Sequence, residues 1–82
     1  MQTITYIVHI EPVEEGGYSA QVPALPGCVT WGRTLEEALD MAKDAIEGYL
    51  FSLQKHGEPI PHERQPHQPF DWGVQVKMPM PA

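Results

Sequence analysis

A long stretch of helical periodicity is the feature that most limits what this chain can fold into. Between residues 35 and 55, apolar side chains recur at steps of three and four: Leu35, Ala38, Leu39, Ala42, Ala45, Ile46, Tyr49, Leu50 and Leu53. This spacing predicts one amphipathic helix from Leu35 to Lys55. Thr34 and Glu37 form a capping-box pattern at its start, and Gly57 is a typical C-terminal stop. Gly48 is unfavourable inside a helix and is compatible with a close backbone approach.

Four shorter runs alternate between apolar and polar residues, which is the period of a β-strand. The first run, Thr3 to Glu11, places Ile4, Tyr6, Val8 and Ile10 on one face. The other three are Tyr18 to Val22, Cys28 to Trp31 and Phe70 to Met78. The predicted order is β-β-β-α-β. We therefore expect an α+β domain in which one helix packs on one face of a small, mostly antiparallel sheet.

A stiff corner follows the second predicted strand, in the sequence VPALPGC. Pro23 ends the strand because proline has no amide to donate to a neighbouring strand. Pro26 and Gly27 suit the two central positions of a type II turn from Leu25 to Cys28. We expect this corner to display Leu25 as an apolar binding residue, although a plain corner between two strands explains the same residues.

The segment between the helix and the last strand is rich in proline. Residues 57–69 contain four prolines, which disfavour regular structure and favour an extended chain. We interpret this segment as a linker inside one domain that spans residues 1–82, with a frayed tail at 79–82. A chain of 82 residues has room for one small domain.

Composition limits the partners that the chain can bind. The formal net charge is −6, from eleven acidic and five basic residues. This balance argues against direct binding to nucleic acid or an anionic membrane, which needs clustered Lys and Arg. It fits a basic partner, and it also fits an acidic surface that only maintains solubility. A single cysteine, Cys28, and no apparent signal peptide or membrane span predict a cytoplasmic protein.

The ionisable residues do not form a recognisable catalytic or metal-binding pattern. We expect the helix carboxylates to face solvent, away from Asp71 on the last strand, so they cannot converge on a pair of metal ions. His62 and His67 lie in the linker, and Cys28 is interpreted as a small buried apolar residue. His9 is expected to be packed or half-exposed. The sequence therefore predicts no enzyme, no metal and no cofactor.

Three features are candidates for binding a partner. The first is a set of five helix carboxylates, called here the acidic helix face: Glu36, Glu37, Asp40, Asp44 and Glu47. A solvated helix face explains these residues equally simply. The second is Trp31, since tryptophan is enriched at interfaces, although Trp31, Phe70 and Trp72 are interpreted first as core residues. The third is the open edge of the sheet, which favours a homodimer or tetramer.

The motifs together resemble the HicB-type antitoxin family, in a short form. The resemblance rests on GGYSAQVPALPGCVTWGRTLEEAL, AIEGYL and GEPIP, and it covers about Tyr6 to Pro61. It implies a partial ribonuclease H-like fold with the order β-β-β-α-β. It also implies that the protein binds and occludes a small basic HicA-type toxin, which cleaves mRNA. The C-terminal DNA-binding region that many members carry is expected to be absent here.

The sequence thus predicts the antitoxin of a type II toxin–antitoxin pair. Its predicted contact residues are Leu25, Trp31 and the acidic helix face. The alternative is a stand-alone homo-oligomeric structural or scaffold domain with no toxin partner.

Overall fold

The computed structural model describes residues 3–64, 68–69 and 71–78 of the chain. Its elements follow the predicted order, and their bounds are β1 (Thr3–Pro12), β2 (Tyr18–Gln21), β3 (Val29–Gly32), α1 (Leu35–Lys55) and β4 (Asp71–Lys77). The helix bounds agree with the prediction, and each strand bound agrees with it or differs by one residue. Phe70, the predicted first residue of the last strand, lies outside the described residues.

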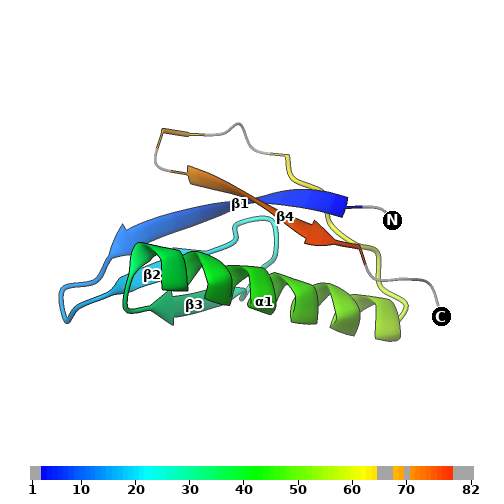
Figure 1. The fold of residues 1–82 in the computed structure, drawn as a ribbon. Helices are drawn as coiled ribbons and strands as arrows, with labels where there is room; N and C mark the ends of the chain where they lie inside the picture. The colour runs from blue at the N-terminus through cyan, green and yellow to red at the C-terminus, as the bar shows by residue number, and fades with distance from the viewer. Residues whose placement is uncertain (1–2, 65–67, 70, 79–82) are drawn as a thin grey trace.

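The four strands form one sheet in the order β3-β2-β1-β4, and every pairing is antiparallel (Figure 1). The last strand pairs along most of the first, from Thr3 opposite Lys77 to His9 opposite Asp71. By contrast, β2 pairs with β1 only between residues 9 and 12. The first half of β1 therefore has a β-strand on one side only, within the described part of the chain.

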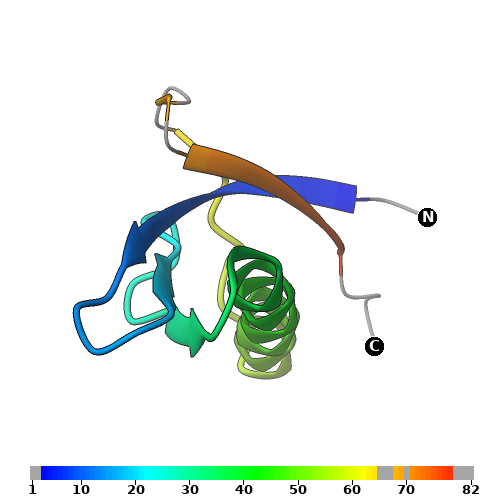
Figure 2. The same ribbon diagram turned by 60° about the vertical axis from the view of Figure 1, so that its left-hand side comes forward.

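The helix α1 lies across one face of this sheet and leaves the other face open (Figure 2). The predicted inward row of β1 is confirmed, because Ile4, Tyr6, Val8 and Ile10 are all buried. These side chains form the core with four helix residues that are fully buried: Ala38, Ala42, Ile46 and Leu50. One sheet face and one helix stripe thus close a single apolar layer.

At its start α1 has one of the two contacts of the predicted capping box, since the Glu37 side chain forms no described hydrogen bond back to the Thr34 amide, and at its end it has the predicted glycine stop. The Thr34 side chain accepts a hydrogen bond of 3.0 Å from the Glu37 amide. At the other end, Gly57 has a φ of +70° and its amide donates to the Gln54 carbonyl, while the Glu58 amide donates to the Leu53 carbonyl. Glycine adopts this left-handed conformation without strain, so the helix stops here.

The close backbone approach that Gly48 is compatible with is not found among the described residues, because a Cβ atom there would have no described neighbour within 4 Å. The close approach lies instead at Gly32, the last residue of β3. A Cβ there would fall less than 3.0 Å from the backbone of Glu37 and Ala38. Gly32 therefore allows the first turn of α1 to rest directly on the end of the strand.

The proline corner is a turn as predicted, but it does not display Leu25. The Cys28 amide donates to the Leu25 carbonyl at 3.0 Å, and Gly27 has a φ of +83°, which fits a type II turn. Tyr49 on α1 donates to the Pro26 carbonyl and so fastens the corner to the helix. Leu25 is 0% exposed and belongs to the core. The corner folds inward because its apolar side chain completes the core.

The predicted linker has no regular structure between residues 57 and 64, but this part is packed rather than free. Ile60 contacts the core, and the Tyr6 hydroxyl donates to the Pro61 carbonyl. The Glu63 carboxylate accepts a 2.7 Å hydrogen bond from the Ile7 amide. Ile7 lies in the half of β1 that β2 does not reach. The segment thus satisfies backbone groups that a longer strand would otherwise have paired.

Candidate partner-binding surface

The acidic helix face lies on the outside of α1. All five of its residues are exposed, because the buried stripe of the helix turns toward the sheet. This agrees with the prediction that these carboxylates face solvent. Within the described residues, none of the five side chains forms an ion pair or a hydrogen bond. No described ion pair or hydrogen bond therefore uses these five carboxylates.

The spacing of these charges along α1 is unfavourable for an isolated helix. Glu36, Asp40 and Asp44 follow one another at steps of four, which places like charges one turn apart. Each such pair costs about 0.2–0.5 kcal/mol, and Lys43, three residues after Asp40 and four before Glu47, offsets only part of this cost. Only Glu36 and Glu37 lie in the first turn, where the helix dipole favours negative charge. A basic surface that approached this face would relieve the repulsion.

Apolar side chains lie among these acids, and they were not among the predicted contact residues. Met41 is 44% exposed and Phe51 is 62% exposed, and the exposed Gly48 lies between them in the sequence. A signal for this was present, because Met41 and Phe51 are the two large apolar residues of α1 that fall outside the predicted apolar stripe. The outer side of the helix is thus mixed in character rather than only acidic.

The prediction that Trp31 and Trp72 belong to the core is wrong. Trp31 is 47% exposed on the open face of the sheet, where its ring packs against Gly17 and its indole N–H donates to the Gly16 carbonyl at 3.1 Å. Trp72 is 42% exposed. It lines a cleft of about 330 Å³ together with Ile10, Pro12, Tyr18, Leu35, Pro69 and Asp71. Trp31 thus remains accessible to a partner, whereas Leu25 does not.

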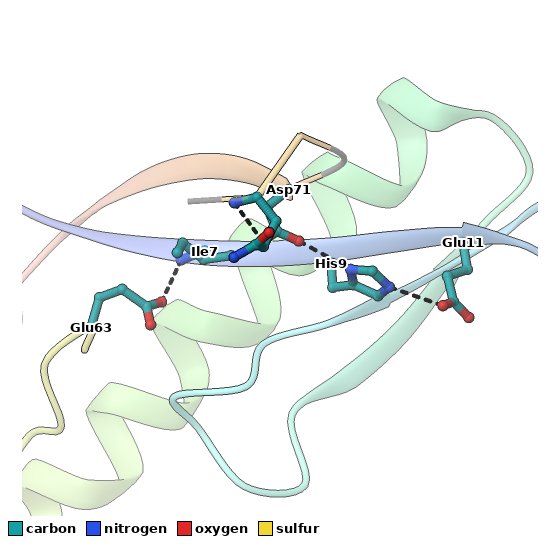
Figure 3. Close-up of polar contacts among 6 residues, drawn as sticks. Ile7, His9, Glu11, Glu63 and Asp71 are labelled. Atoms are coloured by element: carbon teal, nitrogen blue, oxygen red, sulfur yellow. Dashed lines mark hydrogen bonds and ion pairs between the residues drawn. The ribbon is translucent and has the colours of Figure 1, made fainter. Parts of the chain in front are cut away.

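The most connected polar cluster lies on the open face of the sheet, around His9 (Figure 3). Its Nδ1 atom is 3.0 Å from Asp71 Oδ1, and its Nε2 atom is 2.9 Å from Glu11 Oε1. Hydrogen bonds to Asp71 and then to Glu11 raise the pKa of His9. Asp71 also accepts from the Gln68 amide. Since both ring nitrogens have carboxylate partners, His9 ties β1 to β4 and is poorly placed to act as a base.

The remaining candidates for a catalytic or metal-binding residue are unreactive or isolated. Cys28 is buried and free, as predicted, and burial raises the pKa of its thiol, which disfavours the reactive thiolate. His62 is exposed, and His67 lies outside the described residues. In the part of the chain that the structure describes, no group of three or more His, Cys, Asp or Glu side chains could hold a metal ion. No described helix is long and apolar enough to cross a membrane.

Comparison with protein families gives a match over most of the chain. The family described as the HicB-like antitoxin of bacterial toxin–antitoxin systems matches residues 6–69. This chain belongs to that family. A UPF0150 protein of Thermoplasma acidophilum is 52% identical over 58 residues, which cover 71% of this chain and 84% of that protein. Antitoxin HicB 1 of Photorhabdus laumondii is 50% identical over 46 residues, 56% of this chain but 30% of the longer antitoxin.

Solved structures of HicB proteins share the fold. The N-terminal domain of the Burkholderia pseudomallei antitoxin HicB superposes with a TM-score of 0.73 at 20% identity, over 94% of this chain and 100% of that domain. A chain from a HicA3 and HicB3 toxin–antitoxin complex gives a TM-score of 0.63 at 20% identity, over the same shares. These matches confirm the predicted HicB-type α+β fold.

Proposed function

We propose that this HicB-like chain is the antitoxin of a type II toxin–antitoxin pair, and that it binds and occludes a small basic HicA-type toxin that cleaves mRNA. Family membership supports an antitoxin role. The observation that carries the proposed mode of binding is the acidic helix face, whose five carboxylates are exposed and have no partner among the described residues.

In this proposal, the chain competes with RNA for the same basic surface of the toxin. A protein that cleaves mRNA must attract phosphates, and this requires exposed Lys and Arg side chains. A chain with a net charge of −6 and a concentrated acidic face is attracted to the same surface. Once bound, it excludes RNA both by charge and by volume. Trp31 is a separate proposed contact, because its indole is exposed and held in place by Gly16 but lies on the open face of the sheet, the side that α1 does not cover.

The other proposed properties follow from this role. The chain acts by binding rather than by catalysis, in the cytoplasm, without a cofactor and without direct contact to nucleic acid or a membrane. We also propose that it forms a homodimer or tetramer. The outer edge of β4 supports self-association, because its backbone groups face no other strand within the described residues. Size-exclusion chromatography with light scattering tests this point.

The decisive experiment is co-expression with the small basic protein encoded beside this gene, followed by co-purification and a growth-rescue test. Asp40→Lys with Asp44→Lys should weaken the complex by more than about 100-fold and flatten its dependence on salt, because close attractive charge pairs are replaced by repulsive ones. The matched control is Glu14→Lys with Glu15→Lys, which changes the net charge equally at two exposed residues of the β1–β2 loop.

Each outcome has a distinct meaning. Loss of binding in the helix variant alone supports the acidic helix face as the contact. Equal losses in both variants would show that only overall charge matters. A wild-type chain that neither binds nor neutralises the basic protein, or the absence of such a neighbouring gene, would contradict the antitoxin proposal and favour the stand-alone homo-oligomeric domain.

A further inference from the structure

Gly48 is a glycine that the fold itself does not require. It lies in the interior of α1, where glycine destabilises a helix relative to alanine. Its φ is not positive, and a Cβ atom built there meets nothing within 4 Å. Gly32 shows the opposite case, because a Cβ there would collide with the first turn of α1. The reason for Gly48 must therefore be sought outside the described part of this chain.

The neighbours of Gly48 on the helix surface are apolar and acidic. Met41, Asp44, Gly48 and Phe51 follow one another at steps of three, four and three, so they form one stripe along α1. This stripe lies opposite the buried stripe that ends at Leu50. Because Gly48 has no side chain, the helix backbone is uncovered between Asp44 and Phe51.

We propose that Met41, Gly48 and Phe51 form the apolar centre of the toxin contact. An apolar side chain of the basic partner packs against the exposed helix backbone at Gly48. This inference rests on the proposed function and adds the residues that determine the fit. Phe51 supplies the aromatic anchor. Asp40 and Glu47 flank the stripe as a charged rim, and Asp44 adds a third carboxylate between Met41 and Gly48. An apolar centre surrounded by polar residues is the usual anatomy of a protein–protein interface.

The charge of the rim decides which occupant this surface takes. A second copy of the chain packed on the same surface would bring its own acidic residues against Asp40, Asp44 and Glu47. Like charges placed opposite one another across an interface are strongly unfavourable. A partner segment in which Lys or Arg residues flank an apolar side chain matches both the centre and the rim. The outer side of α1 is thus suited to the basic toxin rather than to self-association.

The test uses substitutions whose effects on folding and on binding have opposite signs. Gly48→Ala and Gly48→Gln remove a helix-breaking residue from an open position, so both should raise the melting temperature, by about 4–8 °C for alanine. Gly48→Gln should nevertheless weaken binding to the basic protein of the neighbouring gene by at least about tenfold, because the glutamine side chain occupies the space in which the partner's apolar side chain packs. Phe51→Ala should weaken binding by at least about tenfold with little change in melting temperature.

The control is Trp72→Phe, which alters an apolar residue of β4 that is 42% exposed, similar to the 44% of Met41. It should bind the toxin as the wild-type chain does. If Gly48→Gln and Phe51→Ala bind normally while the Asp40 and Asp44 double reversal releases the toxin, this inference is wrong and the proposed function stands. If the wild-type chain forms no complex, both are wrong. Calorimetric titration measures the affinities, and circular dichroism measures the melting temperatures.

Discussion

The inner and outer sides of α1 differ in what their side chains contact. On the inner side, Ala38, Ala42, Ile46 and Leu50 are 0% exposed and contact the sheet. On the outer side, carboxylates without described partners lie beside exposed apolar residues. Substitutions on the inner side should therefore change the free energy of unfolding, whereas those on the outer side should change binding. The predictions below test this division, beginning with the largest expected effect on stability.

The largest effect is expected from Leu50→Ala on the inner side. Removing a fully buried leucine leaves a cavity, and we expect a loss of about 2–5 kcal/mol in the free energy of unfolding. The outer-side control, Met41→Ala, should change this free energy by less than about 0.5 kcal/mol. Urea denaturation followed by circular dichroism measures both. Similar losses for the two variants would contradict the division.

The next largest effect on the free energy of unfolding is expected at two glycines, Gly32 and Gly48. Gly32→Ala places a methyl group against the backbone of the first turn of α1, and overpacking of this kind costs about 1–3 kcal/mol. Gly48→Ala should instead stabilise the chain by about 1 kcal/mol. Urea denaturation followed by circular dichroism measures the free energy of unfolding of both variants. If Gly32→Ala left stability unchanged, the contact between β3 and α1 would be looser than the structure shows.

Two acidic residues, Glu63 and Glu47, should also differ in their effect on the free energy of unfolding. Glu63 accepts a hydrogen bond from the Ile7 amide, so Glu63→Ala should lose about 1–2 kcal/mol of stability. Glu63→Gln keeps an oxygen acceptor and should recover most of that loss. Glu47→Ala on the outer side should have an effect within about 0.5 kcal/mol. Equal effects at Glu63 and Glu47 would show that the 57–64 segment does not fasten β1.

The smallest effect concerns pH and His9. Because its hydrogen bonds to Asp71 and Glu11 raise the pKa above 6.5, the protonated form favours the folded state. This stabilisation is complete below pH 6.5 and is lost as the pH rises through the pKa of the folded protein. We expect less than about 1 kcal/mol, since the His9 side chain is 40% exposed. Melting temperatures between pH 5.5 and 8.5 should fall less in His9→Gln than in the wild-type chain.

Patterns confined to neighbouring residues were read correctly from the sequence. The bounds of α1, its capping residue Thr34, the turn at Pro26 and Gly27, and the inward row of β1 all depend on residues a few positions apart. The family resemblance also predicted the fold. The acidic helix face was correctly assigned to solvent, because an apolar stripe leaves the opposite side of a helix exposed.

The errors concern burial, which depends on residues far away in the chain. Leu25 is apolar in a turn, and only the packing of the corner against α1 shows that it belongs to the core. Trp31 is apolar in a strand, but its position on the open face of the sheet leaves it exposed. The proline-rich segment has no periodic pattern, so nothing in it indicates that Glu63 would bond to a strand more than fifty residues earlier.

Local backbone geometry and amphipathic spacing therefore follow from the order of the residues, since both are set by steric and hydrogen-bonding preferences over a few positions. Other properties follow only from the tertiary structure. They are the burial of each apolar side chain, the partner of each charge and the need for glycine at a given position. Burial is a property of pairs of segments, and the strand order β3-β2-β1-β4 brings together residues from opposite ends of the chain. The sequence places Gly32 before the helix and Gly48 inside it, but only the packing of α1 shows that a side chain is excluded at Gly32 and not at Gly48.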